Sequence, residues 1–308
     1  MAKEFFLLGF QGTQHVRLLL FSLLLVVNCW TISINVFLIT LVSTSKNLHT
    51  PMYFFLTQLF VNDVLLTLTI VPNMLHLLLS NGATITFTNC ISQLYFFSAS
   101  EASECLLLTV MSYDRYVAIC DPLHYISTMT GAVCVKLAMA SWVVGFSITW
   151  TGIITTSRLR FCGPNIIDHL FCDLVPLLEL SCSDTFIVQL EVSLLSIVLV
   201  ITPSIIIVKS YINIIAAILK ISSSAGRQKT FSTCSSHLIV VSIFYWTLFS
   251  VYVFPSRGKT STVSKILSLL YTVFTPLINP IIYTLRNKDI RNAVSVRITH
   301  TIIYFNNR

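Results

Sequence analysis

Charged residues are scarce in this 308-residue chain. Asp, Glu, Lys and Arg together make up 10% of it, against roughly 25% in an ordinary soluble domain. With 55% hydrophobic residues and a mean hydropathy of +0.83, the composition excludes a soluble globular protein. The nineteen Lys and Arg residues stand singly between apolar stretches. A nucleic-acid-binding protein gathers them in a dense patch, so we expect no nucleic-acid partner despite the net charge of +7.

Catalytic and transport signatures are also missing. The chain contains no H-E-x-x-H, G-x-S-x-G or phosphate-loop motif, which argues against an enzyme. A secondary transporter is expected to show related inverted halves with interrupted helices at matching positions, and no such halves are found. The sequence therefore predicts a membrane protein that binds or signals rather than one that catalyses or transports.

Apolar stretches long enough to cross a lipid bilayer recur along the chain. A spanning helix needs about 20 predominantly apolar residues, and seven stretches qualify: 16–42, 53–79, 90–119, 136–157, 188–219, 231–254 and 264–285. The first is too long for the core of a cleaved signal peptide and is expected to be a signal anchor. The predicted fold is an all-α, seven-transmembrane helix bundle, with a receptor domain at 1–290 and a short tail at 291–308. Most basic residues lie on the side of the tail, which predicts an outer N-terminus and a cytoplasmic C-terminus.

The nine cysteines divide into two groups. Five lie within the apolar spans or on the inner side, where they are ordinary packing residues. Cys90, Cys162, Cys172 and Cys182 all fall on the outer side, and four cysteines allow three disulfide connectivities. Cys162, Cys172 and Cys182 lie in the loop between the fourth and fifth spans. One bond from this loop to Cys90 would hold the loop over the mouth of the bundle. A metal site in the segment 168–172 is the alternative, although disulfides are the default outside the cell.

An acid and a base stand side by side where the third span ends, in MSYDRYVAIC (111–120). Asp114 and Arg115 project about 100° apart on a helix, so they can form a local ion pair while Arg115 also reaches a neighbouring helix. This arrangement favours a membrane switch. The alternative is a helix-end anchor whose charged group extends to the interface.

Five segments of the chain resemble signatures of the vertebrate olfactory receptors, which are rhodopsin-like (class A) G-protein-coupled receptors. The resemblance runs from about Phe6 to Ile290, and the STCSSHL form is similar to the tetrapod-type class. The segments, in family order, are LHTPMYFFL (48–56), MSYDRYVAIC with DPLHY (111–125), HLFCDLVPLLELSC (169–182), GRQKTFSTCSSHL (226–238) and PLINPIIYTLRNKDI (276–290).

The resemblance implies an odorant receptor without enzymatic activity. Such a protein binds a small, largely apolar volatile ligand in the outer half of the bundle. It activates a heterotrimeric, Gs-type olfactory G protein on the cytoplasmic face to raise cAMP. Its location would be the plasma membrane of olfactory cilia. The alternatives are a receptor-like chain that is poorly trafficked or does not signal, and a chemoreceptor for a small molecule that is not an odorant.

Particular residues follow from the resemblance. The implied disulfides are Cys90–Cys172 and Cys162–Cys182. The expected ligand-binding residues are Phe97, Ser98, Glu101, Ala102, Tyr245, Leu248, Phe249, Tyr252, Leu269 and Thr272. The expected switch and G-protein-coupling residues are Asp114, Arg115, Tyr211, Asn279, Pro280 and Tyr283.

Several carboxylates lie inside apolar spans, where ionisable groups are functional hypotheses by default. Glu101 and Glu104 are three residues apart and share a helix face, and Asp63 lies in the second span. Asn35 and Asn279 are polar residues in the otherwise apolar first and seventh spans. Either some of these acids are protonated at rest or a cation sits among them. The resemblance implies a sodium site formed by Asp63 and Glu104, with no other cofactor; a hydrogen-bonded network of neutral acids is the alternative.

Glu101 is not a signature residue of the family. It lies one turn outward of Glu104 and is expected near the floor of the ligand cavity. It either selects a ligand that carries an amine or another hydrogen-bond donor, or extends the inner polar network.

Pro203 and Pro280 each remove a backbone hydrogen bond inside an apolar span and predict kinks. Prolines are also simply tolerated in membrane helices. If the family pattern holds, Tyr211 meets Tyr283 across the cytoplasmic cleft in the active state.

The chain departs from the family at three places. The N-terminus, MAKEFFLLGF, is short and the chain has no N-x-S/T sequon, so altered surface delivery is expected. Ile34-Asn35 replaces a Gly-Asn pair. The tail NAVSVRITHTIIYFNNR is rich in β-branched residues where a basic amphipathic helix is expected. It either lies along the inner membrane face or reflects an altered reading frame.

Overall fold

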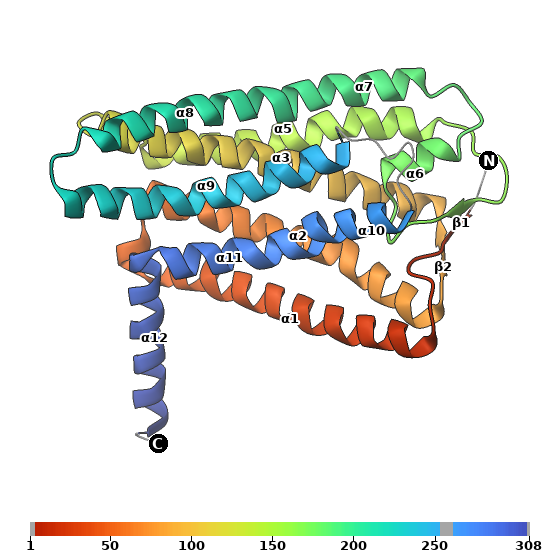
Figure 1. Ribbon diagram of the computed structural model, residues 1–308, viewed down its shortest axis with the longest axis horizontal. Helices are drawn as coiled ribbons and strands as arrows, with labels where there is room; N and C mark the ends of the chain where they lie inside the picture. The colour runs from red at the N-terminus through yellow and green to blue at the C-terminus, as the bar shows by residue number, and fades with distance from the viewer. Residues whose placement is uncertain (1–3, 253–260, 307–308) are drawn as a thin grey trace.

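The computed structural model describes residues 4–252 and 261–306, and in this part of the chain seven long helical segments run side by side (Figure 1). Each segment overlaps one predicted span and extends it by a few residues at one or both ends. The segments are α1 (Gln14–Thr44), α2 (Pro51–Ser80), α3 (Phe87–Cys120), α5 (Gly131–Ser157), α7–η2–α8 (Phe186–Ser196, Ile197–Ile201 and Thr202–Leu219), α9 (Ser224–Tyr252) and α10–η3–α11 (Ser261–Leu269, Leu270–Phe274 and Thr275–Arg286).

Hydropathy explains how these segments meet the bilayer. Within the described residues, six of them are long and apolar enough to cross a membrane, and α9 contributes a shorter apolar stretch, Cys234–Ser250. The first turns of α9 are polar, which shortens that stretch. Large apolar side chains cover the outside of the bundle, among them Leu19, Val26 and Ile187, each at least two-thirds exposed. Such a surface is suited to lipid rather than to water.

Two spans contain a wide π turn directly before a Thr-Pro pair. Thr202 Oγ donates a hydrogen bond to the Ile197 carbonyl at 3.1 Å, and Thr275 Oγ donates to the Leu270 carbonyl at 3.1 Å. Each of these carbonyls also accepts the backbone N–H of the same threonine, so the threonine closes the widened turn with both its N–H and its hydroxyl. A helix irregularity was predicted at Pro203 and is found there, whereas the second was predicted at Pro280 and is found at Pro276. Pro280 instead lies inside the regular part of α11.

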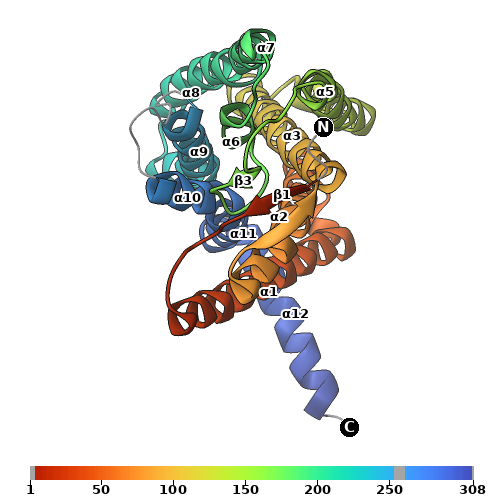
Figure 2. The ribbon, with the colours of Figure 1, turned by 90° about the vertical axis from the view of Figure 1, so that its right-hand side faces the viewer.

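A three-stranded sheet covers the end of the bundle nearest the N-terminus, which we call the outer end (Figure 2). Its order is β2–β1–β3, with β1 (Glu4–Leu7) antiparallel to β2 (Ala83–Thr86) and parallel to β3 (Ile166–Ile167). Phe5 and Leu7 of β1 are buried, whereas Phe6 between them is 37% exposed. The expectation of an all-α protein therefore missed this sheet, because its strands are short and distant in sequence. The protein is mostly helical.

Two disulfides hold the loop that follows α5. Cys90 at the start of α3 is bonded to Cys172, and Cys162 is bonded to Cys182. The Cys172 N–H also donates to Gln93 Oε1 at 3.1 Å, which ties the same loop to α3 a second time. Within the described residues, no group of three His, Cys, Asp or Glu side chains is placed to hold a metal ion. The loop therefore covers the mouth of the bundle as a disulfide-bonded strap.

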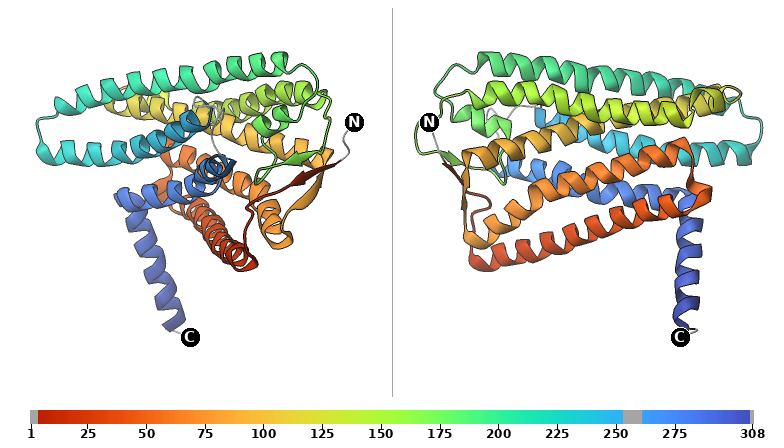
Figure 3. Two further views of the ribbon diagram at one scale, coloured as in Figure 1. Left: turned by 45° about the vertical axis from the view of Figure 1, so that its right-hand side comes forward. Right: turned by 180° about the vertical axis from the view of Figure 1, so that it is seen from behind.

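The tail forms a helix, α12 (Lys288–Asn306), that leaves the bundle across the direction of the other helices (Figures 1 and 3). Its β-branched residues do not prevent helix formation, because propensity is a weak determinant. The Tyr53 hydroxyl lies 3.1 Å from both Asn287 Oδ1 and Asp289 Oδ2, and Ile290 is fully buried. These contacts anchor the start of α12, so the predicted boundary at residue 290 falls inside a helix.

Two short helices complete the described chain between the long ones. They are α4 (Tyr125–Thr128), in the loop after α3, and α6 (Leu174–Glu179), in the disulfide-bonded loop. A 3-10 turn, η1 (Lys46–Leu48), joins α1 to α2.

Candidate functional site

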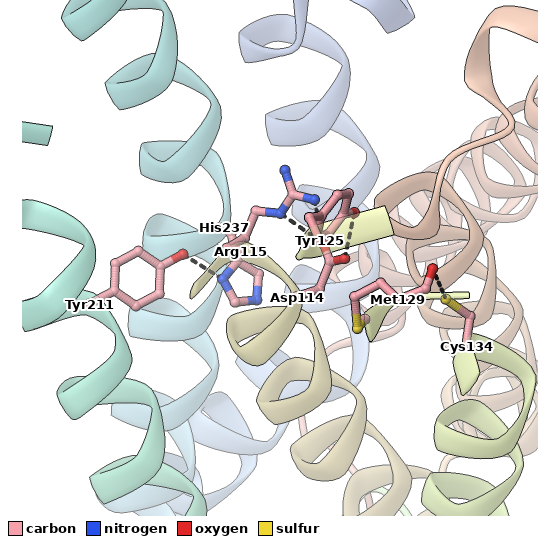
Figure 4. A network of polar contacts seen from close by, with 7 residues as sticks. All are labelled: Asp114, Arg115, Tyr125, Met129, Cys134, Tyr211 and His237. Atoms are coloured by element: carbon pink, nitrogen blue, oxygen red, sulfur yellow. Dashed lines mark hydrogen bonds and ion pairs between the residues drawn. The ribbon is translucent and has the colours of Figure 1, made fainter. Parts of the chain in front are cut away.

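The end of α3 farthest from the sheet, which we call the inner end, holds an ion pair that a third side chain supports (Figure 4). Arg115 Nε donates to Asp114 Oδ2 at 2.8 Å, and its Nη2 contacts the same oxygen. The Tyr125 hydroxyl of α4 donates to Asp114 Oδ1 at 2.8 Å. Burial, and then the Asp114 carboxylate, raises the pKa of the Tyr125 phenol. Asp114 therefore joins the arginine to the following loop, and the phenol keeps its proton at physiological pH.

A second polar pair joins α8 to α9 near Arg115. The Tyr211 hydroxyl lies 2.6 Å from His237 Nδ1 and donates to the Cys234 carbonyl at 3.3 Å. Figure 4 shows Tyr211 and His237 facing each other beside the ion pair. Sequence reasoning did not single out His237, although it lies in the STCSSHL segment. The polar partner of Tyr211 is thus on α9.

Tyr283 is separate from Tyr211 in this arrangement. Its hydroxyl is buried and has no hydrogen-bond partner within the described residues, and its ring packs against Phe60. A crevice of only about 10 Å³ lies here, lined in part by Arg115, His237 and Tyr283. This volume is about that of one water molecule. The inner end of the bundle is closed.

A buried amide bridges two carboxylates in the middle of the bundle. Asn279 Nδ2 donates to Asp63 at 3.1 and 3.3 Å and to Glu104 Oε1 at 3.4 Å. Asn62, which sequence reasoning missed, donates to Glu104 Oε2 at 3.2 Å. Asn35 instead donates to the Pro276 carbonyl at 3.2 Å. Two buried carboxylates that share one amide need a proton or a cation between them, and the oxygen ligands suit a hard cation.

A cavity of about 130 Å³ lies in the outer half of the bundle between α3, α5, the loop before α6, α7–η2 and α9. Four of the expected ligand-binding residues line it: Ser98, Glu101, Ala102 and Leu248. Sequence reasoning missed the other lining residues: Cys105, Thr149, Asp173, Leu174, Val192, Leu195, Ser196, Leu199 and Val200. Asp173 lies in the HLFCD segment, and that segment was the available signal for it.

Five other expected pocket residues lie elsewhere. Phe97 packs against Phe171 and Tyr271. Phe249 is 44% exposed, because its face of α9 is turned out of the bundle. The remaining three are turned to other neighbours: Tyr245 donates to the Cys105 carbonyl, Thr272 donates to the Ser268 carbonyl, and Leu269 packs in the cluster around Phe97. The Tyr252 side chain lies outside the described residues.

A buried lysine ties the N-terminal strand to the strap. Lys265 of α10 is 5% exposed; its Nζ donates to the Gly9 carbonyl at 2.7 Å and pairs with Asp168. In the adjacent residue, His169 Nδ1 lies 3.1 Å from the Phe171 carbonyl oxygen and His169 Nε2 lies 3.0 Å from Ser268 Oγ. Burial lowers the pKa of His169, and nearby Asp173 opposes this shift only in part. His169 is therefore neutral at physiological pH, and Lys265 provides the local positive charge.

We expect Lys265→Met to loosen β1. The substitution keeps the apolar stem but removes the ammonium that Gly9 and Asp168 share, at a cost of about 1–3 kcal/mol. Hydrogen–deuterium exchange should then accelerate at the Phe6, Leu8 and Gly9 amides, which donate to the carbonyls of the strap. The matched control is Lys136→Met, at an exposed lysine on α5. Unchanged exchange in the 4–9 segment would show that the ammonium does not hold the strand.

Comparison with known proteins agrees with this geometry. A family model described as olfactory receptor matches residues 21–301. The human olfactory receptor 11L1 is 47% identical over 94% of this chain and 90% of its own length, and the human olfactory receptor 10A7 is 43% identical over 97% of this chain and 95% of its own. In fold, the structure is similar to squid rhodopsin, with a TM-score of 0.72, 18% identity, and coverage of 93% of this chain and 81% of that one. The protein is therefore a multi-pass membrane protein of rhodopsin-like seven-helix fold that belongs to the olfactory receptor family.

Proposed function

We propose that this receptor binds a small volatile molecule in the cavity beneath the strap and activates a Gs-type heterotrimeric G protein at its inner end, raising cAMP. The observation that carries the proposal is that one helix, α3, connects the two sites. The same helix lines the outer cavity through Ser98, Glu101 and Ala102 and ends inward at the Asp114–Arg115 pair. The proposed cellular location is the plasma membrane, with β1 outside the cell and α12 in the cytoplasm.

The two ends also communicate through α9. Leu248 of α9 lines the cavity, and His237 of the same helix holds Tyr211 near Arg115. A ligand that displaces α9 relative to α3 would separate Tyr211 from His237 and widen the closed inner crevice. Arg115, Tyr211 and Tyr283 would then become available to the G protein. The π turns before Pro203 and Pro276 provide places where the neighbouring spans can bend.

A cell-based assay tests the proposal. The chain is expressed with an olfactory G protein and a cAMP reporter, with and without a glycosylated N-terminal leader, and exposed to a broad odorant panel. Surface display is measured on the same cells. We expect a ligand-dependent rise in cAMP once the receptor is displayed. Silence across the panel despite confirmed display would reject a signalling role.

We propose that Asp63, Glu104 and Asn279 form a sodium-linked or proton-linked part of the switch. Asn279→Ala removes the donor that both carboxylates share, and is expected to cost about 1–3 kcal/mol of stability. Thermal unfolding of the purified receptor measures this loss, with Asn292→Ala on the exposed surface of α12 as the control. Replacing sodium by choline separates the two forms of the proposal. A lower unfolding temperature of the wild type indicates sodium, whereas no change indicates a protonated network.

A further inference from the structure

We infer that a groove at the corner of α1, α11 and α12 binds an anionic phospholipid from the half of the bilayer nearest α12. The groove has a volume of about 330 Å³ and is lined by five residues of α1, from Trp30 to Leu38, by Thr284 of α11 and by Val294 of α12. It shares no lining residue with the cavity beneath the strap. The groove is therefore a second candidate site, separate from the proposed odorant cavity.

The α1 wall of the groove has nearly the length of one leaflet of the bilayer. Its lining residues fall at 30, 33, 34, 37 and 38, which is the spacing of a single helix face. At a rise of 1.5 Å per residue they extend over about 12 Å, against about 15 Å for half of the hydrocarbon core. Trp30 and Phe37 are 60% and 40% exposed. The groove thus faces the lipid and follows the direction in which an acyl chain lies.

The volume and the chemistry of the lining suit one hydrocarbon chain. A cavity of about 150 Å³ accommodates benzene, so 330 Å³ holds about thirteen carbon atoms at that density. The two hydroxyls of the lining already donate to carbonyls of their own helices, Ser33 Oγ to Cys29 at 2.7 Å and Thr284 Oγ to Pro280 at 2.6 Å. An acyl chain can therefore fill the groove without leaving a polar group of the lining unsatisfied.

Two bases of α12 lie where the head of such a lipid has to be. Arg291 precedes the lining residue Val294 by three residues, so the two share a helix face. Lys288 lies a further three residues back, and both bases are exposed. Since α12 crosses the direction of the bundle at the inner end (Figures 1 and 3), these bases lie at the end of the groove where a chain meets its headgroup. Lys and Arg at a membrane surface attract anionic lipids.

The acids of the inner end do not neutralise these two bases. There are three such acids, and no acid follows the last of them, Asp289, in the whole sequence. Each contacts a different side chain; the pairs are Asp114–Arg115, Asp121–His124 and Asp289–Tyr53. Within the described residues, neither Lys288 nor Arg291 forms an ion pair. The charge of α12 next to the groove is therefore positive, and the lipid that complements it is anionic.

Quenching of Trp30 fluorescence by brominated lipids tests the inference, because bromine on an acyl chain quenches an indole that it touches. The purified full-length receptor is reconstituted in phosphatidylcholine bilayers that contain increasing fractions of brominated phosphatidylserine or of brominated phosphatidylcholine. Subtracting the signal of Trp30→Phe isolates Trp30. We expect phosphatidylserine to bind about 25-fold more strongly than phosphatidylcholine, since each of the two bases contributes about fivefold.

Substitutions at exposed positions separate the charge from the groove. Lys288→Gln and Arg291→Gln should each lower the preference for phosphatidylserine about fivefold, whereas Arg291→Lys should keep it. Lys136→Gln, at an exposed lysine of α5 outside the groove, is the matched control and should leave the preference unchanged. Ser33→Phe fills the groove and should abolish the preference. Its control is Ser22→Phe, at an exposed serine about three turns outward on α1.

Three results would overturn the inference. Equal quenching by the two brominated lipids would show that the groove takes any acyl chain and does not select an anionic lipid. A preference that falls as far in Lys136→Gln as in Arg291→Gln would assign the attraction to the whole inner surface. Identical quenching of the wild type and Trp30→Phe would show that no lipid enters the groove. None of these measurements involves an odorant or a G protein, so the proposed function stands or falls separately.

Discussion

Arg115→Ala is expected to abolish ligand-stimulated cAMP production while the receptor is still displayed at the surface. Arg115 lies at the inner end of α3, where its guanidinium pairs with Asp114 and borders the closed crevice that His237 and Tyr283 also line. A five-donor guanidinium is suited to bind acceptors of a partner once the crevice opens. Alanine removes these donors without affecting the outer cavity. The reporter assay should therefore fall to the level of cells without receptor.

Matched substitutions separate this role from a loss of folding. Arg158→Ala, at an exposed arginine beyond the outer end of α5, should signal normally. Asp114→Asn keeps the shape but removes the charge that holds Arg115, and should raise ligand-independent cAMP. Tyr125→Phe removes one hydrogen bond to Asp114 and should raise ligand-independent cAMP by a smaller amount. Full agonist response in a displayed Arg115→Ala receptor would contradict the assignment.

Cys90→Ser is expected to cause the largest loss of stability and of surface display among single substitutions on the outer side. The Cys90–Cys172 bond closes a loop with a sequence separation of 82, and Cys162–Cys182 one of 20. From loop-closure entropy, the first disulfide should stabilise the folded state by about 4.5 kcal/mol and the second by about 3.3 kcal/mol. The first bond also positions Asp173 and the strap. Since a folded protein is stable by only about 5–15 kcal/mol, its loss should leave little folded receptor.

Thermal unfolding measures the loss of stability, and flow cytometry of a tagged receptor measures the loss of surface display. Cys182→Ser should fall between Cys90→Ser and the wild type. Cys29→Ser, at an exposed free cysteine on α1, should match the wild type. Cys172→Ser should behave as Cys90→Ser does, and the double variant should be no worse than either. A greater loss in Cys182→Ser would show that loop length does not dominate.

Several parts of the fold were predictable because they depend on local composition. About 20 apolar residues are what a helix needs to cross lipid, and each long helical segment overlaps a stretch found on that basis. Asp114 and Arg115 are neighbours in sequence, so their ion pair needed no knowledge of the tertiary fold. Asp63, Glu104 and Asn279 were found as polar residues in apolar surroundings, where burial leaves them few partners except one another.

Other parts depend on which helix faces which. Phe249 and Leu248 are adjacent in sequence, yet one is exposed on the outside of the bundle and the other lines the cavity. The low amphipathicity of a membrane helix gives little indication of this difference, because lipid and protein interior are equally apolar. The partner of Tyr211 and the contribution of Asp173 to the cavity likewise depend on residues distant in sequence.

The sequence by itself determined the membrane-spanning segments, the family and the Asp114–Arg115 pair at the end of α3, because hydropathy and short motifs are local properties. Only the tertiary structure decided the three-stranded cover at the outer end, the pairing of Tyr211 with His237 and the meeting of Glu101 and Asp173 at the cavity beneath the strap. Each of these joins segments dozens of residues apart, and it is the packing of helices and the disulfide-bonded strap that brings them into contact.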